Sequence, residues 1–179
     1  MTDRMILNTG DIPATALDKK NLSGKLRADI NRLKSEFYDL ERGRIDYSAL
    51  RDSEAFGEYV TTTRHLQDFD PGQLATRAER LAFWINLYNT LVIHGAIALD
   101  VTKSVKDVDN FFRRVGYQIG SQIYTLDDIE HGILRGNVRC PYGIFLPFSA
   151  SDPRREHVIT PPDPRIHFTL VCGSTSCPP

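Results

Sequence analysis

The sequence lacks most of the features that assign a chain to a functional class at once. Only three of its 179 residues are cysteine, and a small, odd number of cysteines excludes a disulfide-stapled scaffold. Basic and acidic residues nearly cancel, at 22 against 23, so a dedicated nucleic-acid binder with a basic face is not expected. The first residues contain no apolar stretch long enough for a signal peptide. We therefore expect a cytoplasmic protein whose thiols are free.

Known catalytic signatures are also missing. The chain has no glycine-rich phosphate loop, no GxSxG elbow and no HExxH motif, and we predict no cofactor and no bound metal. One alternative is a metal site built from His131, His167 and Cys177. The spacing between Cys172 and Cys177 resembles a zinc ribbon only marginally, because the sequence has no matching second pair.

What is present is typical of one globular domain. Hydrophobic residues make up 41% of the chain and charged residues 25%, close to the globular average. Residues 1–20 show no apolar periodicity and are expected to form a loose N-terminal arm. Residues 21–179 are predicted to form a single α+β domain, with several helices around a buried central helix that packs on a small antiparallel or mixed sheet.

Apolar residues recur every three or four positions between Leu22 and Arg42. They are Leu26, Ile30, Leu33, Phe37 and Leu40. This spacing predicts a helix with one apolar face that ends at Gly43. Packing of that face on the domain's own core is the simpler interpretation. The alternative is a short coiled-coil seam that engages a protein partner.

A central helix is predicted from Thr76 to Leu99. Thr76 and Glu79 match a capping box at its start. Residues 81–99 carry no charge and are long enough to span a membrane. Polar residues interrupt them at Asn86, Asn89, Thr90 and His94. Because such residues are costly in lipid, we expect no membrane contact and a helix buried inside a soluble domain, with Trp84 and Tyr88 inside.

The other elements follow from periodicity and turn residues. They are, in order, a helix over 53–66 capped by Ser53, a short helix over 104–114, a hairpin over 115–124 turning at Gly120–Ser121, a helix over 126–135 capped by Thr125, a long loop over 140–164 anchored by Phe145, Leu146 and Phe148, and a strand over Ile166–Cys172.

The end of the chain offers the most suggestive chemistry. Cys177 precedes a proline after a turn, as at a helix start, where the positive end of the helix dipole favours a thiolate. His167, on the predicted strand, is the candidate base. Thiol hydrolases add a third group that orients the base. The candidates for that group are Asn86, Asn89, Glu130 and Asp163.

Each of these residues also has a structural interpretation. Cys177 could pack at a helix cap, and His167 could be a satisfied strand histidine. The two asparagines could pin a neighbouring loop. Cys140 and Cys172 are expected to be less reactive, Cys172 because it shares the apolar face of its strand. His131 lies one helical turn from Asp127 and Arg135, which indicates an exposed row of ion pairs.

Three segments together resemble a known family. They read AFWINLYN at 82–89, YTLDDIEHGILR at 124–135 and DPRIHFTLVCGSTSCPP at 163–179. The residues and the order of these segments resemble the family called domain of unknown function 547. The resemblance extends from about Ile45 to the end of the chain. The resemblance implies a fold and no established activity. It also implies a domain that continues past Pro179, so the chain is expected to be incomplete at its C-terminus and less stable than the whole domain.

Two functions remain open at this point. The first is a thiol-dependent hydrolase or acyl transferase that acts on an amide or thioester of an unknown small-molecule or peptide substrate, with Cys177 as nucleophile and His167 as base. The second is a non-catalytic interaction domain whose N-terminal helix and long loop engage a protein partner. The sequence does not identify the substrate.

Overall fold

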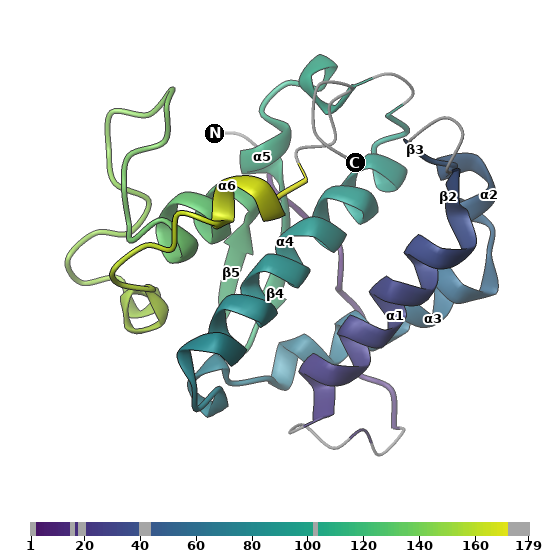
Figure 1. The fold of residues 1–179 in the computed structure, drawn as a ribbon, viewed down its shortest axis with the longest axis horizontal. Coiled ribbons are helices and arrows are strands. Elements are labelled where there is room, and N and C mark those ends of the chain that lie inside the picture. The colour runs from purple at the N-terminus through teal and green to yellow at the C-terminus, as the bar shows by residue number, and fades with distance from the viewer. Residues whose placement is uncertain (1–2, 15–16, 18–20, 40–43, 102–103, 172–179) are drawn as a thin grey trace.

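The computed structural model describes residues 3–14, 17, 21–39, 44–101 and 104–171, which form the predicted α+β fold. One long helix, α4 (Arg77–Ala98), runs through the middle of the molecule. Helices α1 (Leu22–Phe37) and α3 (Glu54–Arg64) lie on one side of α4, and a three-stranded sheet lies on the other (Figure 1). The core is therefore built around α4.

Helix α4 begins and packs as predicted. Its capping box is complete: the backbone N–H of Glu79 donates to the Thr76 hydroxyl (3.1 Å), and the Glu79 carboxylate accepts from the Thr76 N–H (2.9 Å). Trp84 and Tyr88 are buried. Among the described residues α4 is the one helix long and apolar enough to cross a membrane, yet 72% of its most apolar window is buried inside the fold. Its apolar side chains thus form the core.

The apolar face of α1 also belongs to the core. Leu26, Ile30 and Leu33 are buried, and α1 packs on both α3 and α4. The prediction that this face docks on the domain's own core is therefore confirmed. These three side chains are not available to a protein partner.

Helix α1 is shorter than predicted. It ends at Phe37 and not at Arg42, because Tyr38 is extended and pairs with Ile45 in a small hairpin of β2 (Tyr38–Asp39) and β3 (Arg44–Ile45). The predicted stop at Gly43 lies outside the described residues. Local pairing has here replaced the last helical turn that the periodicity indicated.

The sheet is small and mixed, with the order β1-β4-β5. Strands β4 (Val115–Ile119) and β5 (Gln122–Thr125) form the predicted antiparallel hairpin, and Gly120 takes up the positive φ of +56° that its turn requires. Strand β1 (Met5–Ile6) pairs with β4 in parallel. The hairpin rests against α4 and carries the chain towards the next helix.

Part of the expected N-terminal arm is built into the fold, which corrects the prediction of a loose arm over 1–20. Residues 5 and 6 pair with β4, and Asn8 is fully buried. The Asn8 amide donates to the carbonyls of Thr63 (3.0 Å) and Gln118 (2.8 Å), and it accepts from the Gln118 N–H (2.8 Å). A polar anchor of this kind leaves no apolar periodicity, so the sequence pattern missed it.

Several short elements connect these parts. They are α2 (Tyr47–Arg51), η2 (His65–Asp68), η3 (Pro71–Gln73), η4 (Val105–Asp107), α5 (Phe111–Arg114) and η6 (Pro153–His157). The helix predicted over 53–66 is α3, and its cap is Ser53, whose hydroxyl accepts from the Phe56 N–H (3.1 Å). The short helix predicted over 104–114 is divided between η4 and α5.

The helix predicted over 126–135 is present, with an unusual winding. After Leu126 and Asp127 it continues as η5 (Asp128–Leu134), a π-helix. The predicted cap is confirmed, because the Asp128 N–H donates to the Thr125 hydroxyl (3.2 Å) and the Asp128 carboxylate accepts from the Thr125 N–H (3.0 Å). Segments with π-winding are frequent at functional sites.

A glycine on η5 allows a close approach of the loop that follows. A Cβ atom on Gly132 would lie 2.4 Å from Cζ of Phe148. Phe148 is fully buried, and its backbone is held by two hydrogen bonds of 3.0 Å to the Asn137 side chain. The ring therefore cannot move aside easily.

We expect Gly132→Ala to lower the free energy of unfolding by about 1–3 kcal/mol, the usual cost of overpacking a core. Urea denaturation measures this change. The double variant Gly132→Ala/Phe148→Leu is the control, because the smaller side chain removes the clash and should recover part of the loss. If the double variant is no more stable than the sum of the two single changes predicts, the contact does not cause the effect.

The C-terminal segment differs from the prediction. Residues 166–169 form a short helix, α6 (Ile166–Thr169), and not the start of a strand over Ile166–Cys172. The Asp163 carboxylate accepts from the Arg165 N–H (3.0 Å), and the Leu170 N–H donates to the Ile166 carbonyl (3.3 Å). These local bonds close a helical turn that the alternating apolar residues did not indicate.

Candidate functional site

Three of the six predicted site residues, Glu130, His167 and Asn89, gather where η5, α4 and α6 meet. The Tyr88 hydroxyl on α4 donates to the Glu130 carboxylate on η5 (2.9 Å). The Arg135 guanidinium donates from Nε to the other Glu130 oxygen (2.9 Å) and lies 3.1 Å from both ring nitrogens of His167 on α6. A chain of polar contacts thus runs from the core to His167.

The donors and acceptors in this row of polar contacts, from Tyr88 to His167, determine its chemistry. Burial and the neighbouring Glu130 carboxylate raise the pKa of Tyr88 above its usual range, so the hydroxyl keeps its proton and donates it. The Arg135 guanidinium lies equally close to both ring nitrogens of His167 and so holds the ring in place. Glu130 therefore acts on His167 through Arg135 and does not touch it. His167 itself is exposed.

Asn89 holds the backbone that follows His167. Its amide donates to the Thr169 carbonyl (2.9 Å), and its oxygen accepts from the Val171 N–H (2.9 Å). This geometry matches the predicted pinning of a neighbouring segment. Asn86 lies one turn earlier and is half-buried, and no hydrogen bond among the described residues joins its side chain to Asn89 or Glu130.

Asp163 pairs with Arg165 and not with His167. Its two carboxylate oxygens accept from the Arg165 guanidinium at 2.9 and 2.7 Å. These bonds lower the pKa of Asp163 to about 2. Its side-chain hydrogen bonds within the described part of the chain go to Arg165 and not to His167. Cys172 and Cys177 lie outside the described residues, so the predicted contact between Cys177 and His167 stays a prediction.

A second cluster, which the sequence reasoning missed, includes His131 of η5. Asp127, His131 and Cys140 are all buried, and one ligand atom from each lies within 4.8 Å of the other two. The Arg113 guanidinium donates to Oδ2 of Asp127 (3.0 Å). Burial and the Asp127 carboxylate raise the pKa of the Cys140 thiol to about 11, and burial lowers the pKa of His131.

This cluster corrects the prediction for His131. His131 is only 8% exposed, so it does not belong to an exposed row of ion pairs with Asp127 and Arg135. The alternative metal site of His131, His167 and Cys177 stays a prediction, because Cys177 lies outside the described residues. The one sequence signal for the cluster is the four-residue spacing of Asp127 and His131, which puts both on one helix face.

The long loop after Cys140 also differs from its prediction. Phe148 is a buried anchor as expected, whereas Phe145 is 81% exposed and Leu146 is 48% exposed. Tyr142 and Ile144 are exposed as well. The apolar residues of 142–146 therefore face solvent and do not hold the loop to the core.

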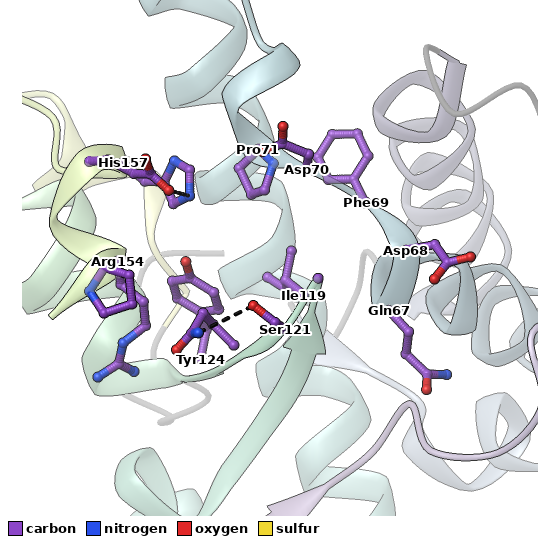
Figure 2. A pocket seen from close by; sticks show the side chains of 14 residues that line it. Gln67, Asp68, Phe69, Asp70, Pro71, Ile119, Ser121, Tyr124, Arg154 and His157 are labelled. Carbon is purple, nitrogen blue, oxygen red and sulfur yellow. Dashed lines mark hydrogen bonds and ion pairs between the residues drawn. The ribbon is translucent and has the colours of Figure 1, made fainter.

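A surface pocket lies apart from the predicted site residues. It has a volume of about 360 Å³ and is lined by η3, the tip of the β4–β5 hairpin and η6. Figure 2 shows Pro71, Tyr124 and His157 around it. The Nε2 atom of His157 lies 3.3 Å from the Glu156 carboxylate. None of the residues predicted to carry chemistry lines this pocket.

The comparison with known proteins identifies a family for this chain. Neither the curated proteins nor the solved structures include a chain that matches this one. The family model described as "Protein of unknown function, DUF547" matches residues 72–179. This range is more than half of the chain, and it holds α4, the hairpin, η5 and α6. The chain therefore belongs to the DUF547 family.

Proposed function

We propose that the domain is a thiol-dependent hydrolase or acyl transferase acting on an amide or thioester, with Cys177 as nucleophile and His167 as base. The observation that supports this function is the network that fixes His167. Arg135 bonds to its ring, Glu130 holds Arg135, and Tyr88 holds Glu130. A base that acts on a thiol needs a defined position, and the contacts that hold the ring of His167 support this role.

The proposed reaction has two steps. The Cys177 sulfur attacks the carbonyl carbon of the substrate while His167 takes the thiol proton. The bond from the carbonyl carbon to nitrogen or sulfur then breaks, and the leaving amine or thiol takes that proton from His167. Water or an acceptor nucleophile attacks the resulting thioester and loses a proton to His167. The bond from the carbonyl carbon to the Cys177 sulfur then breaks, and the sulfur takes that proton from His167. Asn89 contributes by holding residues 169–171, which lead the chain towards Cys177.

The role of Arg135 in this function is positional. Its guanidinium is held by Glu130 through Nε at 2.9 Å and through a second nitrogen at 2.8 Å. Both partners are largely shielded from solvent, with 22% and 18% of their side chains exposed. An ion pair of this kind keeps one geometry better than a fully exposed pair does. Substrate acyl groups would reach His167 from the solvent side, where the ring is exposed.

The test compares the reactivity of the three cysteines in the 179-residue chain. We expect iodoacetamide to modify Cys177 at pH 7 faster than Cys140, because Cys140 is buried and the pKa of its thiol is raised to about 11. His167→Ala should slow modification of Cys177 by roughly 10-fold, since the thiolate fraction falls when its base is removed. Peptide mass spectrometry against pH gives the rate at each cysteine.

The matched control is His65→Ala, which removes a partly exposed histidine of η2. It should leave the rate at Cys177 unchanged. A panel of aryl thioesters and amides then tests catalysis, with an acyl adduct expected on Cys177 and absent in Cys177→Ser. A Cys177 that titrates like a free thiol near pH ~8.5 and ignores the loss of His167 would rule out the proposed mechanism.

A further inference from the structure

The Asp127–His131–Cys140 cluster combines three residue types that bind metals. Asp127 and His131 are one helical turn apart on one face of the segment that ends in η5. Cys140 returns to the same face after the chain turns at Gly136, where φ is +78°. The three ligand atoms lie within 4.8 Å of one another, and all three residues are buried.

The turn that returns Cys140 is fixed by the backbone. The Val138 N–H donates to the His131 carbonyl (3.0 Å), and the Asn137 N–H donates to the Gly132 carbonyl (2.9 Å). These bonds tie the start of the loop to η5 next to His131. The approach of Cys140 to His131 is therefore a built feature of the fold.

The imidazole of His131 gives an independent indication of a ligand. Its Nδ1 atom is buried and has no hydrogen-bond partner among the described residues, and the whole residue is 8% exposed. Leaving a buried polar atom unpaired costs roughly 1–3 kcal/mol. Most buried nitrogens in proteins therefore have a partner, and a metal ion is one partner that an imidazole nitrogen takes.

We propose that Asp127, His131 and Cys140 bind a divalent transition-metal ion of the zinc class. Carboxylate oxygen, imidazole nitrogen and thiolate sulfur are the ligands that zinc takes in proteins. Three protein ligands leave a fourth tetrahedral position open, as in catalytic zinc sites. A set that includes thiolate excludes magnesium and calcium, which prefer oxygen ligands alone.

Arg113 is compatible with this site. It uses Oδ2 of Asp127 at 3.0 Å, and a carboxylate has a second oxygen for a metal. Ligating carboxylates are commonly held by such an outer hydrogen bond, which fixes their orientation. The side chain of Arg113 is 42% exposed, so much of its charge is screened by water. Metal binding also requires the Cys140 thiol to lose its proton to solvent, which the ion itself promotes.

The test uses cobalt(II) as a spectroscopic probe of the metal-stripped 179-residue chain. We expect one Co²⁺ to bind per chain, with a thiolate-to-cobalt charge-transfer band and the intense visible bands of tetrahedral coordination, and we expect Zn²⁺ to displace it. Cys140→Ser should abolish the charge-transfer band. His131→Gln and Asp127→Asn should weaken binding by more than the ~10–100-fold that loss of an outer partner costs.

The control is the double variant Cys172→Ser/Cys177→Ser, which removes the other two thiols and should keep the full spectrum. This control also separates the metal site from the proposed thiol function, which the double variant abolishes. Circular dichroism shows whether each variant is folded. Absence of the charge-transfer band in the unmodified chain overturns the proposal without any variant. A band that persists in Cys140→Ser, or disappears in the double variant, also overturns it.

Discussion

Replacing Trp84 by alanine is expected to lower the free energy of unfolding by about 3–5 kcal/mol, the usual cost of truncating a large buried aromatic side chain. Trp84 is fully buried on α4. Its ring contacts Phe83 at 5.1 Å and Tyr124 at 5.0 Å between centroids, and so joins the central helix to the hairpin. Alanine would leave a cavity between these two elements, because a packed core collapses only in part.

A second variant separates volume from hydrogen bonding. The indole Nε1 of Trp84 is buried and has no partner among the described residues, which costs stability in the native chain. Trp84→Phe removes this unpaired donor and leaves a smaller cavity. We therefore expect it to lose clearly less stability than Trp84→Ala does.

Urea denaturation measures both changes, and Phe145→Ala is the matched control. Phe145 is 81% exposed, so its removal should change the free energy of unfolding by less than ~0.5 kcal/mol. If Trp84→Ala costs no more than Phe145→Ala, the core does not depend on α4 as described.

The parts of the fold that the sequence predicts well are those with local signals. The capping box of Thr76 and Glu79, the cap of Ser53 and the turn at Gly120 each involve residues a few positions apart. Their hydrogen bonds form within one turn of chain, so no distant contact is needed to decide them. The apolar stripe of α1 is equally local, and its burial follows from its period.

The predictions that the structure corrects depend on contacts that the local sequence pattern does not contain. Asn8 enters the core through bonds to residues 55 and 110 positions away, which no window of sequence contains. The segment from Ile166 has the alternation of a strand, yet Asp163 and the following backbone close a helical turn there. Short apolar runs are ambiguous between helix and strand, and tertiary and capping contacts decide them.

In the candidate site, too, local signals identify some residues, whereas contacts between distant segments are not predicted. The sequence identifies Asn89 because a polar residue on a largely buried helix needs partners, and its partners lie just after His167. The link through Arg135 was not predicted, because it depends on where α6 lies against η5. The sequence places Cys140 at the start of a long loop and does not predict its approach to His131, because that approach depends on the turn at Gly136.

The histidine of α4 makes stability depend on pH. His94 is buried, and its Nδ1 lies 2.9 Å from the Tyr117 hydroxyl, which in turn lies 2.7 Å from the Tyr59 hydroxyl. The Phe56 ring meets the imidazole edge-on at 5.4 Å. No carboxylate among the described residues pairs with the ring, so burial lowers the pKa of His94 from 6.5 to about 4.

The direction of the effect follows from where the proton binds. Between pH 6.5 and about 4 the unfolded chain protonates this histidine and the folded chain does not, so acid favours unfolding. The contribution of neutral His94 is complete above pH 6.5 and is lost as the pH falls towards 4. At ~1.36 kcal/mol for each pH unit in that interval, the loss is roughly 3 kcal/mol.

The measurement is urea denaturation of the unmodified chain and of His94→Gln at pH 7 and pH 4.5. Burial also lowers the pKa of His131 and His157, so the unmodified chain should lose stability from all three histidines, and the variant should lose less by up to about 3 kcal/mol. Gly132→Ala is the control, because its steric cost does not titrate and should be equal at both pH values. Equal losses in the unmodified chain and in His94→Gln would show that His94 is accessible to protons in the folded state, contrary to the buried contacts with Tyr117 and Phe56.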